Sequence, residues 1–152
     1  QQVDRALRAG AMAVGGRVQV TTLPGYLPLQ NNPSMLDIYG ANAAALVGES
    51  NITQLGHRTG STDMGDVSHL MPVIHPYAVA ATGTGHGSDY LVQDYELGVL
   101  TAAKAMAMTV VDLLANGAHH ARTIKADYQA PLTKAQYLSL MRSMFEEASY
   151  TE

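Results

Sequence analysis

The pattern of apolar and polar positions changes period several times along the 152 residues. Residues 2–14 are rich in alanine and place their larger apolar side chains near a common face, which predicts a helix. A glycine pair follows and ends it. Residues 17–23 alternate in polarity and contain β-branched side chains, which predicts a strand. The prolines and glycine within residues 24–28 then predict an extended linker.

After the linker the chain predicts helices separated by loops and short strands. Asn32 and Pro33 form a helix start, as cap and first helical residue. Thr133 opens the last helix with a capping box. The predicted elements between 33 and 145 are a helix to Gly48, a short strand at 52–55, a loop at 60–65, a buried strand at 73–81, a glycine-rich loop at 82–88, a long helix from about 94 to 116 that Gly117 ends, and the last helix from 133.

This order of elements predicts a mixed α/β fold with loops gathered at one edge of a sheet. The linker at 24–28 separates a small helix–strand unit from the rest and predicts a domain boundary.

Composition narrows the classes of function. A net charge of −4 and no basic run argue against a nucleic-acid partner. No stretch of about 18 consecutive apolar residues occurs, so we expect no membrane span. The absence of cysteine excludes disulfides and thiolate metal sites and fits a cytoplasmic location. Because the chain begins with Gln1 and not with methionine, we expect it to be part of a longer protein.

Polar chemistry is concentrated in residues 54–90, which hold four of the six histidines, three aspartates and six glycines. His86 has a glycine on each side, so it can approach an ion closely, and neutral imidazole is a common ligand of zinc. The alternative is an exposed loop histidine, since a metal site needs two or three further ligands that local spacing does not supply.

A second candidate lies in the loop at 60–66. The hydroxyls of Ser61 and Thr62 with nearby amides are suited to binding a carboxylate, and Asp63 and Asp66 could hold the loop by accepting bonds from its amides. The plain alternative is a polar turn that bonds to itself.

The remaining histidines indicate less. His57 carries no clear signal, and His69 is suited to a helix end. His75 lies in an apolar run and is expected to be a satisfied core or edge histidine. The pair His119–His120 follows the Gly117 stop and is expected in a solvated loop.

Taken in order, the motifs YLPLQNNPSM, GSTDMGDVSHLMP and GHGSDY and the alanine-rich helix after them resemble the C-terminal portion of dinuclear-metal peptidases and amidohydrolases of the aminoacylase type. The GSTDMGDVS wording is most similar to the aminobenzoyl-glutamate utilization protein B branch. The resemblance implies that residues 1–24 end a lid or dimerisation domain. It also implies that residues 29–152 are the C-terminal part of an α/β catalytic domain, with a branch-specific tail at about 120–152.

The resemblance also implies an activity. The family hydrolyses an amide with two divalent metal ions, zinc or manganese, and a glutamate as general base. His86 matches the last metal ligand, and Ser61 and Thr62, with Asp63 beside them, match the loop that holds the substrate's carboxylate. The substrate would be a small-molecule amide such as an N-acyl amino acid, and the protein a homo-oligomer.

The departure from the family is equally informative. Its early HxD ligand motif, its bridging aspartate and its Glu-Glu pair are not in this chain, so we expect no catalytic residue here and an inactive, metal-free fragment. Two alternatives remain open: a non-catalytic α/β module that binds a carboxylate through the 61–66 loop, and a structural or interaction protein.

Overall fold

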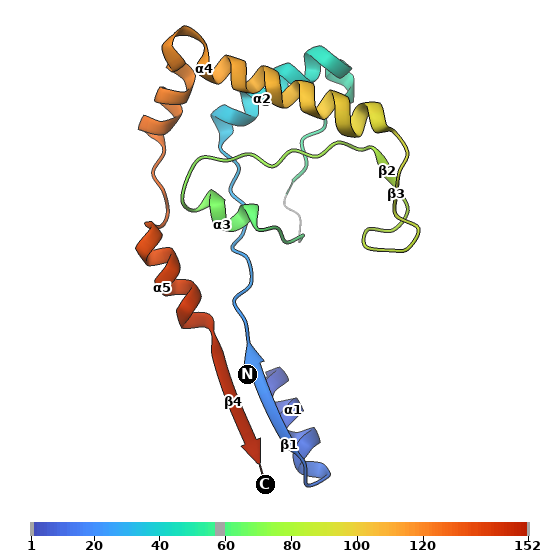
Figure 1. Cartoon of the computed structure of the whole chain (residues 1–152), viewed down its shortest axis with the longest axis vertical. Coiled ribbons are helices and arrows are strands. Elements are labelled where there is room, and N and C mark those ends of the chain that lie inside the picture. Colours follow the sequence, from blue (N-terminus) through green and yellow to red (C-terminus); the bar gives the residue numbers. More distant parts are fainter. Residues whose placement is uncertain (1, 57–59, 152) are drawn as a thin grey trace. The chain divides into compact units, whose positions relative to one another are not determined.

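A computed structural model describes residues 2–56 and 60–151 of the chain. The chain divides into two units: residues up to Tyr26 together with those from Leu132 onward, and Leu27–Pro131 (Figure 1). The described residues form helices and two small antiparallel sheets. This combination confirms the predicted mixed α/β class. The division falls inside the proline-containing linker, while the assignment of the parts to a lid and a catalytic domain stays a prediction.

The first unit contains a helix, a two-stranded antiparallel sheet and a second helix. Their bounds are α1 Gln2–Ala13, β1 Arg17–Thr22, α5 Lys134–Met144 and β4 Glu146–Thr151. Gly15 takes a φ of 64° in the turn after α1, a left-handed conformation that costs glycine little. The predicted helix at 2–14 and strand at 17–23 are therefore confirmed to within a residue.

The strand β4 was not expected from the sequence. It pairs with β1 along the full length of both strands, from Arg17 opposite Thr151 to Thr22 opposite Glu146. The Arg8 guanidinium lies 4.0 Å from the centroid of the Tyr150 ring, a cation–π contact that joins α1 to β4. The end of the predicted tail is thus a structural partner of the chain's beginning.

Two helix starts formed as the sequence indicates. The Asn32 Oδ1 accepts a bond from the Met35 amide at 3.0 Å, with Pro33 in the first turn of α2. At α5, the Thr133 Oγ1 accepts from the Gln136 amide at 3.2 Å, and the Gln136 side chain accepts from the Thr133 amide at 2.8 Å. This reciprocal pair is the predicted capping box.

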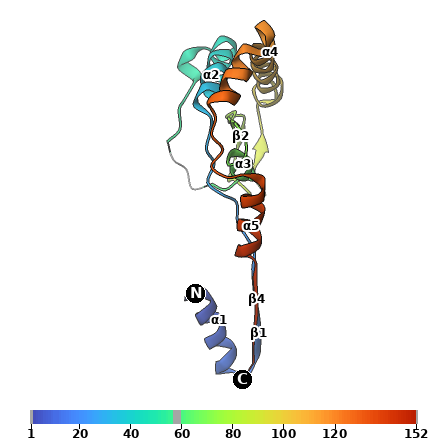
Figure 2. The ribbon, with the colours of Figure 1, turned by 90° about the vertical axis from the view of Figure 1, so that its left-hand side faces the viewer.

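The second unit holds the remaining elements. They are α2 Pro33–Val47, the 3₁₀ turn η1 Glu49–Asn51, α3 Met64–Ser68, β2 Ala81–Thr82, β3 Leu91–Val92, the π-helical segment η2 Glu96–Thr101 and α4 Ala102–Asp127. The strands β2 and β3 form a short antiparallel hairpin. The two views agree in placing α2 and α4 together at one end of this unit, with α3 and the hairpin nearer its other end (Figures 1 and 2).

Polar groups join α2 to α4. Asn42 is buried and its Nδ2 donates to the Asp112 Oδ2 at 2.7 Å and to the Thr109 Oγ1 at 3.4 Å. Thr109 donates in turn to the Ala105 carbonyl at 2.8 Å. Ala105 is 2% exposed.

Helix α4 is interrupted where the sequence predicts its end. Ala115 leaves the helical conformation, and Asn116, Gly117 and Ala118 all have positive φ. The helix then resumes as far as Asp127, so the expectation of a loop for the His119–His120 pair is wrong. Both of those side chains are exposed on the resumed helix.

The stretch Glu96–Asp127 is also long and apolar enough to cross a membrane by length and composition alone. A core helix of a water-soluble protein passes the same test, so this finding is weak evidence for a membrane. Only 11% of its most apolar window is buried. Most residues of that window are therefore exposed or half-buried in the part of the chain that the structure describes.

Two predicted strands and one predicted loop differ in the structure. Residues 52–55 form no strand, and of the strand expected at 73–81 only Ala81 pairs, as part of β2. A strand needs a ladder of backbone bonds to a neighbouring strand, and among the described residues 73–80 makes only isolated ones, such as that from the Asn32 amide to the Val73 carbonyl. The loop expected at 60–65 is shorter than predicted, because α3 begins at Met64.

Candidate functional site

His86 lies at the tip of the loop that joins β2 to β3. Its side chain is exposed and its backbone takes a φ of 63°. The loop is shaped by a bond from the Gly87 amide to the Thr84 carbonyl at 2.7 Å and one from the Thr84 amide to the Asp89 Oδ2 at 3.2 Å. A left-handed non-glycine residue is uncommon and is often found at functional positions.

The described residues do not form a complete metal site around His86. Within 2–56 and 60–151 there is no group of three or more histidine or acidic side chains that could hold a metal ion. One imidazole does not hold a divalent ion against water, so further ligands have to come from elsewhere. The metal-binding role of His86 therefore stays a prediction.

The Ser61–Asp63 loop leads directly into α3. The Thr62 Oγ1 accepts a bond from the Met64 amide and donates to the Asp63 Oδ1, each at 3.3 Å. Ser61 and Asp63 are exposed. The hydroxyl of Thr62 is thus occupied in shaping the turn, as the self-bonding alternative expects, while Ser61 and Asp63 face solvent.

The side chain of Asp66 also reaches beyond the loop that the sequence predicts it to hold. Its Oδ1 accepts from the Leu27 amide at 2.8 Å and so binds the start of the linker segment 27–32. Gly65 lies against the same segment, because a Cβ at this position would clash with the Leu27 carbonyl oxygen. The GDVSH motif therefore holds the linker segment.

Ser68 and His69 continue this attachment one turn later. The Ser68 Oγ accepts from the Gln30 amide at 3.1 Å and donates to the Gly65 carbonyl at 2.5 Å. The His69 Nδ1 lies 2.9 Å from the Gly65 carbonyl oxygen, and its Nε2 lies 3.3 Å from the Gln30 Nε2. These distances place the proton of His69 on Nδ1. His69 also ends α3, as predicted.

Tyr128 reaches the same cluster from the end of α4. Its hydroxyl donates to the Ser68 carbonyl at 2.6 Å. Burial raises the pKa of the Tyr128 phenol, since desolvation disfavours the phenolate. Sequence reasoning missed this cluster because its members lie 38 to 60 residues apart.

His75 is not the satisfied histidine that the sequence predicts. Its Nδ1 is buried and has no hydrogen-bond partner. Its backbone amide donates to the Asn31 Oδ1 at 2.9 Å, which ties the extended segment 73–80 to the linker segment 27–32. His57, the other histidine of the dense stretch, lies outside the described residues.

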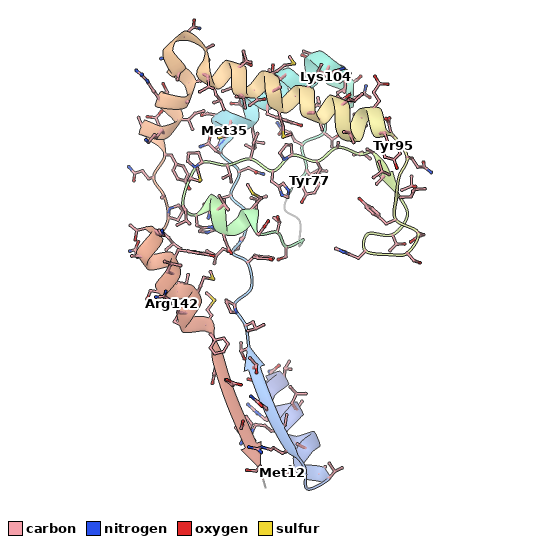
Figure 3. All side chains as sticks on the ribbon, viewed as in Figure 1. Met12, Met35, Tyr77, Tyr95, Lys104 and Arg142 are labelled. Carbon is pink, nitrogen blue, oxygen red and sulfur yellow. The ribbon has the colours of Figure 1, made fainter. Side chains whose placement is uncertain are left out.

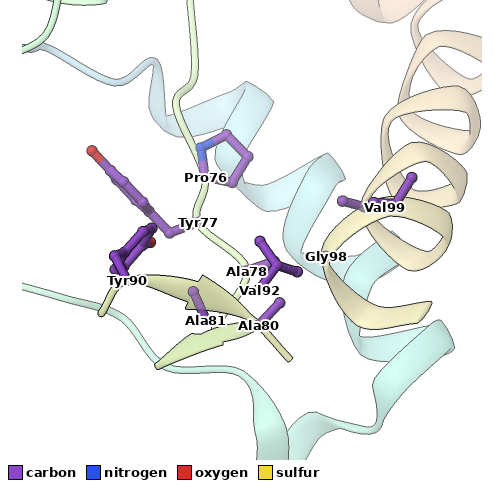
Figure 4. A pocket seen from close by; sticks show the side chains of 10 residues that line it. Pro76, Tyr77, Ala78, Ala80, Ala81, Tyr90, Val92, Gly98 and Val99 are labelled. Atoms are coloured by element: carbon purple, nitrogen blue, oxygen red, sulfur yellow. The ribbon is translucent and has the colours of Figure 1, made fainter. Parts of the chain in front are cut away.

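An open hollow of about 320 Å³ lies beside the His86 hairpin (Figure 4). Its walls come from segment 76–81, the hairpin and the start of the long helix. The lining residues are Pro76, Tyr77, Ala78, Ala80, Ala81, Tyr90, Val92, Gly98, Val99 and Ala102. The rings of Tyr77 and Tyr90 point away from the helix that carries Gly98 and Val99.

Comparison with known proteins places the chain in a broad class: it is related to peptidases and amidohydrolases. Human Xaa-Arg dipeptidase is 29% identical over 147 residues, which are 91% of this chain and 34% of the human protein. Mouse Xaa-Arg dipeptidase is 32% identical over 122 residues, which are 75% of this chain and 28% of the mouse protein. The chain thus spans about a third of the length of these relatives. No protein-family model and no solved structure matches.

Proposed function

We propose that this chain forms part of a metal-dependent amidohydrolase or peptidase that cleaves an N-acyl amino acid, an aminobenzoyl-glutamate-like amide or a dipeptide. The observation that carries the proposal is the similarity to Xaa-Arg dipeptidases along nearly the whole chain. The exposed, left-handed His86 supports it, because a displayed imidazole is suited to complete an ion site whose other ligands lie elsewhere.

Each side chain has a defined part in this proposal. His86 would bind one of two divalent ions, zinc or manganese, which lower the pKa of a bound water and polarise the amide carbonyl. The exposed Ser61, with Thr62 and Asp63 shaping its turn, would hold the carboxylate end of the substrate. The intact protein would be a cytoplasmic homo-oligomer without a nucleic-acid or membrane partner.

Substitution of His86 by alanine in the intact protein tests the proposal. A lost metal ligand should reduce hydrolysis by more than the 10–100-fold that is typical of an outer-shell partner, and it should lower the bound metal measured by elemental analysis. The matched control is His119→Ala, which removes an exposed imidazole from α4. Unchanged metal content and turnover in His86→Ala would contradict the role of His86.

The chain by itself should hydrolyse neither N-acyl amino acids nor dipeptides, because the described residues lack a complete set of ion ligands. The second candidate is a module that binds a carboxylate and catalyses no reaction. The incomplete set of ion ligands among the described residues favours it. Calorimetry of the intact protein with and without zinc or manganese separates the two. A ligand that binds equally in both conditions and is never hydrolysed would favour the module.

A further inference from the structure

The Nδ1 atom of His75 stands out among the polar side-chain atoms of the described residues. It is buried and is the one such atom there without a hydrogen-bond partner. His69 shows the usual solution, since its Nδ1 lies 2.9 Å from a carbonyl oxygen. A buried polar atom left unpaired destabilises the fold, and such atoms often mark functional groups.

The backbone around His75 is held on both sides of the residue. The His75 amide donates to the Asn31 Oδ1 at 2.9 Å, and the Asn32 amide donates to the Val73 carbonyl at 2.8 Å. Helix α3 holds the linker segment 27–32, and this segment in turn holds the backbone at His75. The ring is presented by fixed backbone, which is the arrangement expected of a ligand-binding side chain.

The burial of Nδ1 decides which nitrogen carries the proton in the neutral ring. A proton on Nδ1 would leave a buried N–H donor without an acceptor, and orphaned donors are rarer than under-used acceptors. A proton on Nε2 instead leaves Nδ1 as a buried acceptor that carries only a lone pair. The Nε2 of His75 is not fully buried and makes no hydrogen bond to another described residue, so it is available to a ligand.

This tautomer argues against metal binding by His75. A histidine that binds a metal through Nε2 carries its proton on Nδ1 and donates it to a carboxylate, a carbonyl or water. The Nδ1 of His75 has no such acceptor. The side chain is suited instead to donate an N–H bond to an oxygen atom.

Tyr77 indicates what lies next to that oxygen. Residues two apart in an extended chain share a face, and the His75 and Tyr77 ring centroids are 5.0 Å apart at an interplanar angle of 47°. Tyr77 is 69% exposed, and its ring points away from α4 (Figures 3 and 4). A histidine N–H beside an open aromatic ring fits a carbonyl oxygen that is joined to an apolar or aromatic group.

We propose that His75 is a substrate-binding residue whose Nε2–H donates to the acyl oxygen of an N-acyl amino acid, with the apolar acyl group packed on Tyr77. The assignment rests on the proposed function and adds to it a residue for the acyl side of the bond. The chemical class it selects is an amide with an apolar or aromatic acyl group, such as an N-benzoyl amino acid.

The tautomer is tested in the intact protein, apart from any measurement of activity. Long-range ¹H–¹⁵N spectra of the histidine rings should show a bare nitrogen at Nδ1 of His75 and a protonated one at Nε2. His69 is the internal reference, because its contacts place the proton on Nδ1. Protonation of His75 at Nδ1 would overturn the proposal whatever the activity of the intact protein.

Binding is tested in the intact protein with two variants at this position. His75→Phe should lower kcat/KM for N-benzoylglycine about tenfold or more, mainly through KM, because one hydrogen bond to substrate is lost. His75→Gln keeps an N–H donor near the Nε2 position and should stay within about threefold of the wild type. Bound metal should be unchanged in both variants, and His119→Phe is the matched control.

The outcomes separate this assignment from the proposed function. Wild-type kcat/KM in His75→Phe, with hydrolysis intact, would overturn the role of His75 alone. Loss of bound metal in His75→Gln, with the fold retained by circular dichroism, would make His75 a metal ligand and also overturn it. An intact, metal-loaded protein that hydrolyses no N-acyl amino acid or dipeptide would overturn both proposals.

Discussion

At residue 65 the lack of a side chain allows α3 to lie against the linker segment 27–32. A Cβ there would meet the backbone carbonyl of Leu27, which is held in place by the bond from the Leu27 amide to Asp66. We expect Gly65→Ala to lower the free energy of unfolding by about 1–3 kcal/mol, the cost typical of overpacking. Urea unfolding followed by circular dichroism measures it. Gly60→Ala, where a Cβ meets nothing within 4 Å, is the control. Equal stability of the two variants would contradict the close approach.

Tyr128, which bonds to the Ser68 carbonyl, should make the free energy of unfolding depend on pH in the alkaline range. Burial raises the pKa of its phenol above the ordinary value of 10.0, so the folded chain keeps the proton longer than the unfolded chain does. This contribution is fully present below about pH 10 and is lost as pH rises through the folded-state pKa. Tyr39, whose pKa burial also raises, adds a contribution of the same sign.

We therefore expect the free energy of unfolding to fall with pH above about 10 and to fall less steeply in Tyr128→Phe. The variant should also be less stable at neutral pH, because it lacks the 2.6 Å bond to the Ser68 carbonyl. Unfolding curves at several alkaline pH values measure both effects. Identical slopes in the two proteins would show that Tyr128 does not carry the dependence.

At the scale of elements, the contact between α2 and α4 depends on Asn42. Its amide is buried and donates to Asp112 and Thr109 on the facing helix. Asn42→Ala should cost about 1–3 kcal/mol, because it leaves those oxygens without their donor. Asp37→Ala, at an exposed position of the same helix, should stay within about 0.5 kcal/mol. Thermal unfolding of both variants tests this, and similar losses would mean that Asn42 is not special.

The elements that the sequence predicted correctly are those with local signals. The caps at Asn32 and Thr133 and the break at Gly117 each depend on residues within one turn, and all three are present. Strand pairing depends on distant partners. For this reason β4 was missed, although its partner β1 was predicted, and the strand expected at 73–81 found almost no partner.

In the candidate site too, features with local signals were predicted and contacts between distant residues were not. The glycine-rich composition of residues 82–88 predicted the loop that carries His86, whereas its role as a metal ligand stays a prediction. The bonds from Asp66, Ser68 and His69 to the linker segment 27–32 join residues about 39 apart, and no local pattern marks them. The enclosure of the His75 Nδ1 likewise results from packing, which a single sequence does not display.

At the scale of the whole molecule, the described chain leaves many large apolar side chains in water. Val110, Val111 and Leu114 of α4 are 52%, 66% and 62% exposed, and α2 covers only part of that helix. Contiguous apolar surface of this kind drives association. We expect the isolated chain to self-associate, so that light scattering gives a mass above the 16.1 kDa of the monomer.

The face of α4 can be tested as the cause. Val110 and Leu114 lie one turn apart on the same side of the helix, so Val110→Lys combined with Leu114→Lys should shift the chain toward monomer by charging the apolar face. His120→Lys, an added charge at an exposed polar position, should not. A monomeric wild-type chain at every concentration would contradict the expectation. Association that persists unchanged in the double variant would place the contact on another surface, and the exposed α4 would then not be what joins the chains.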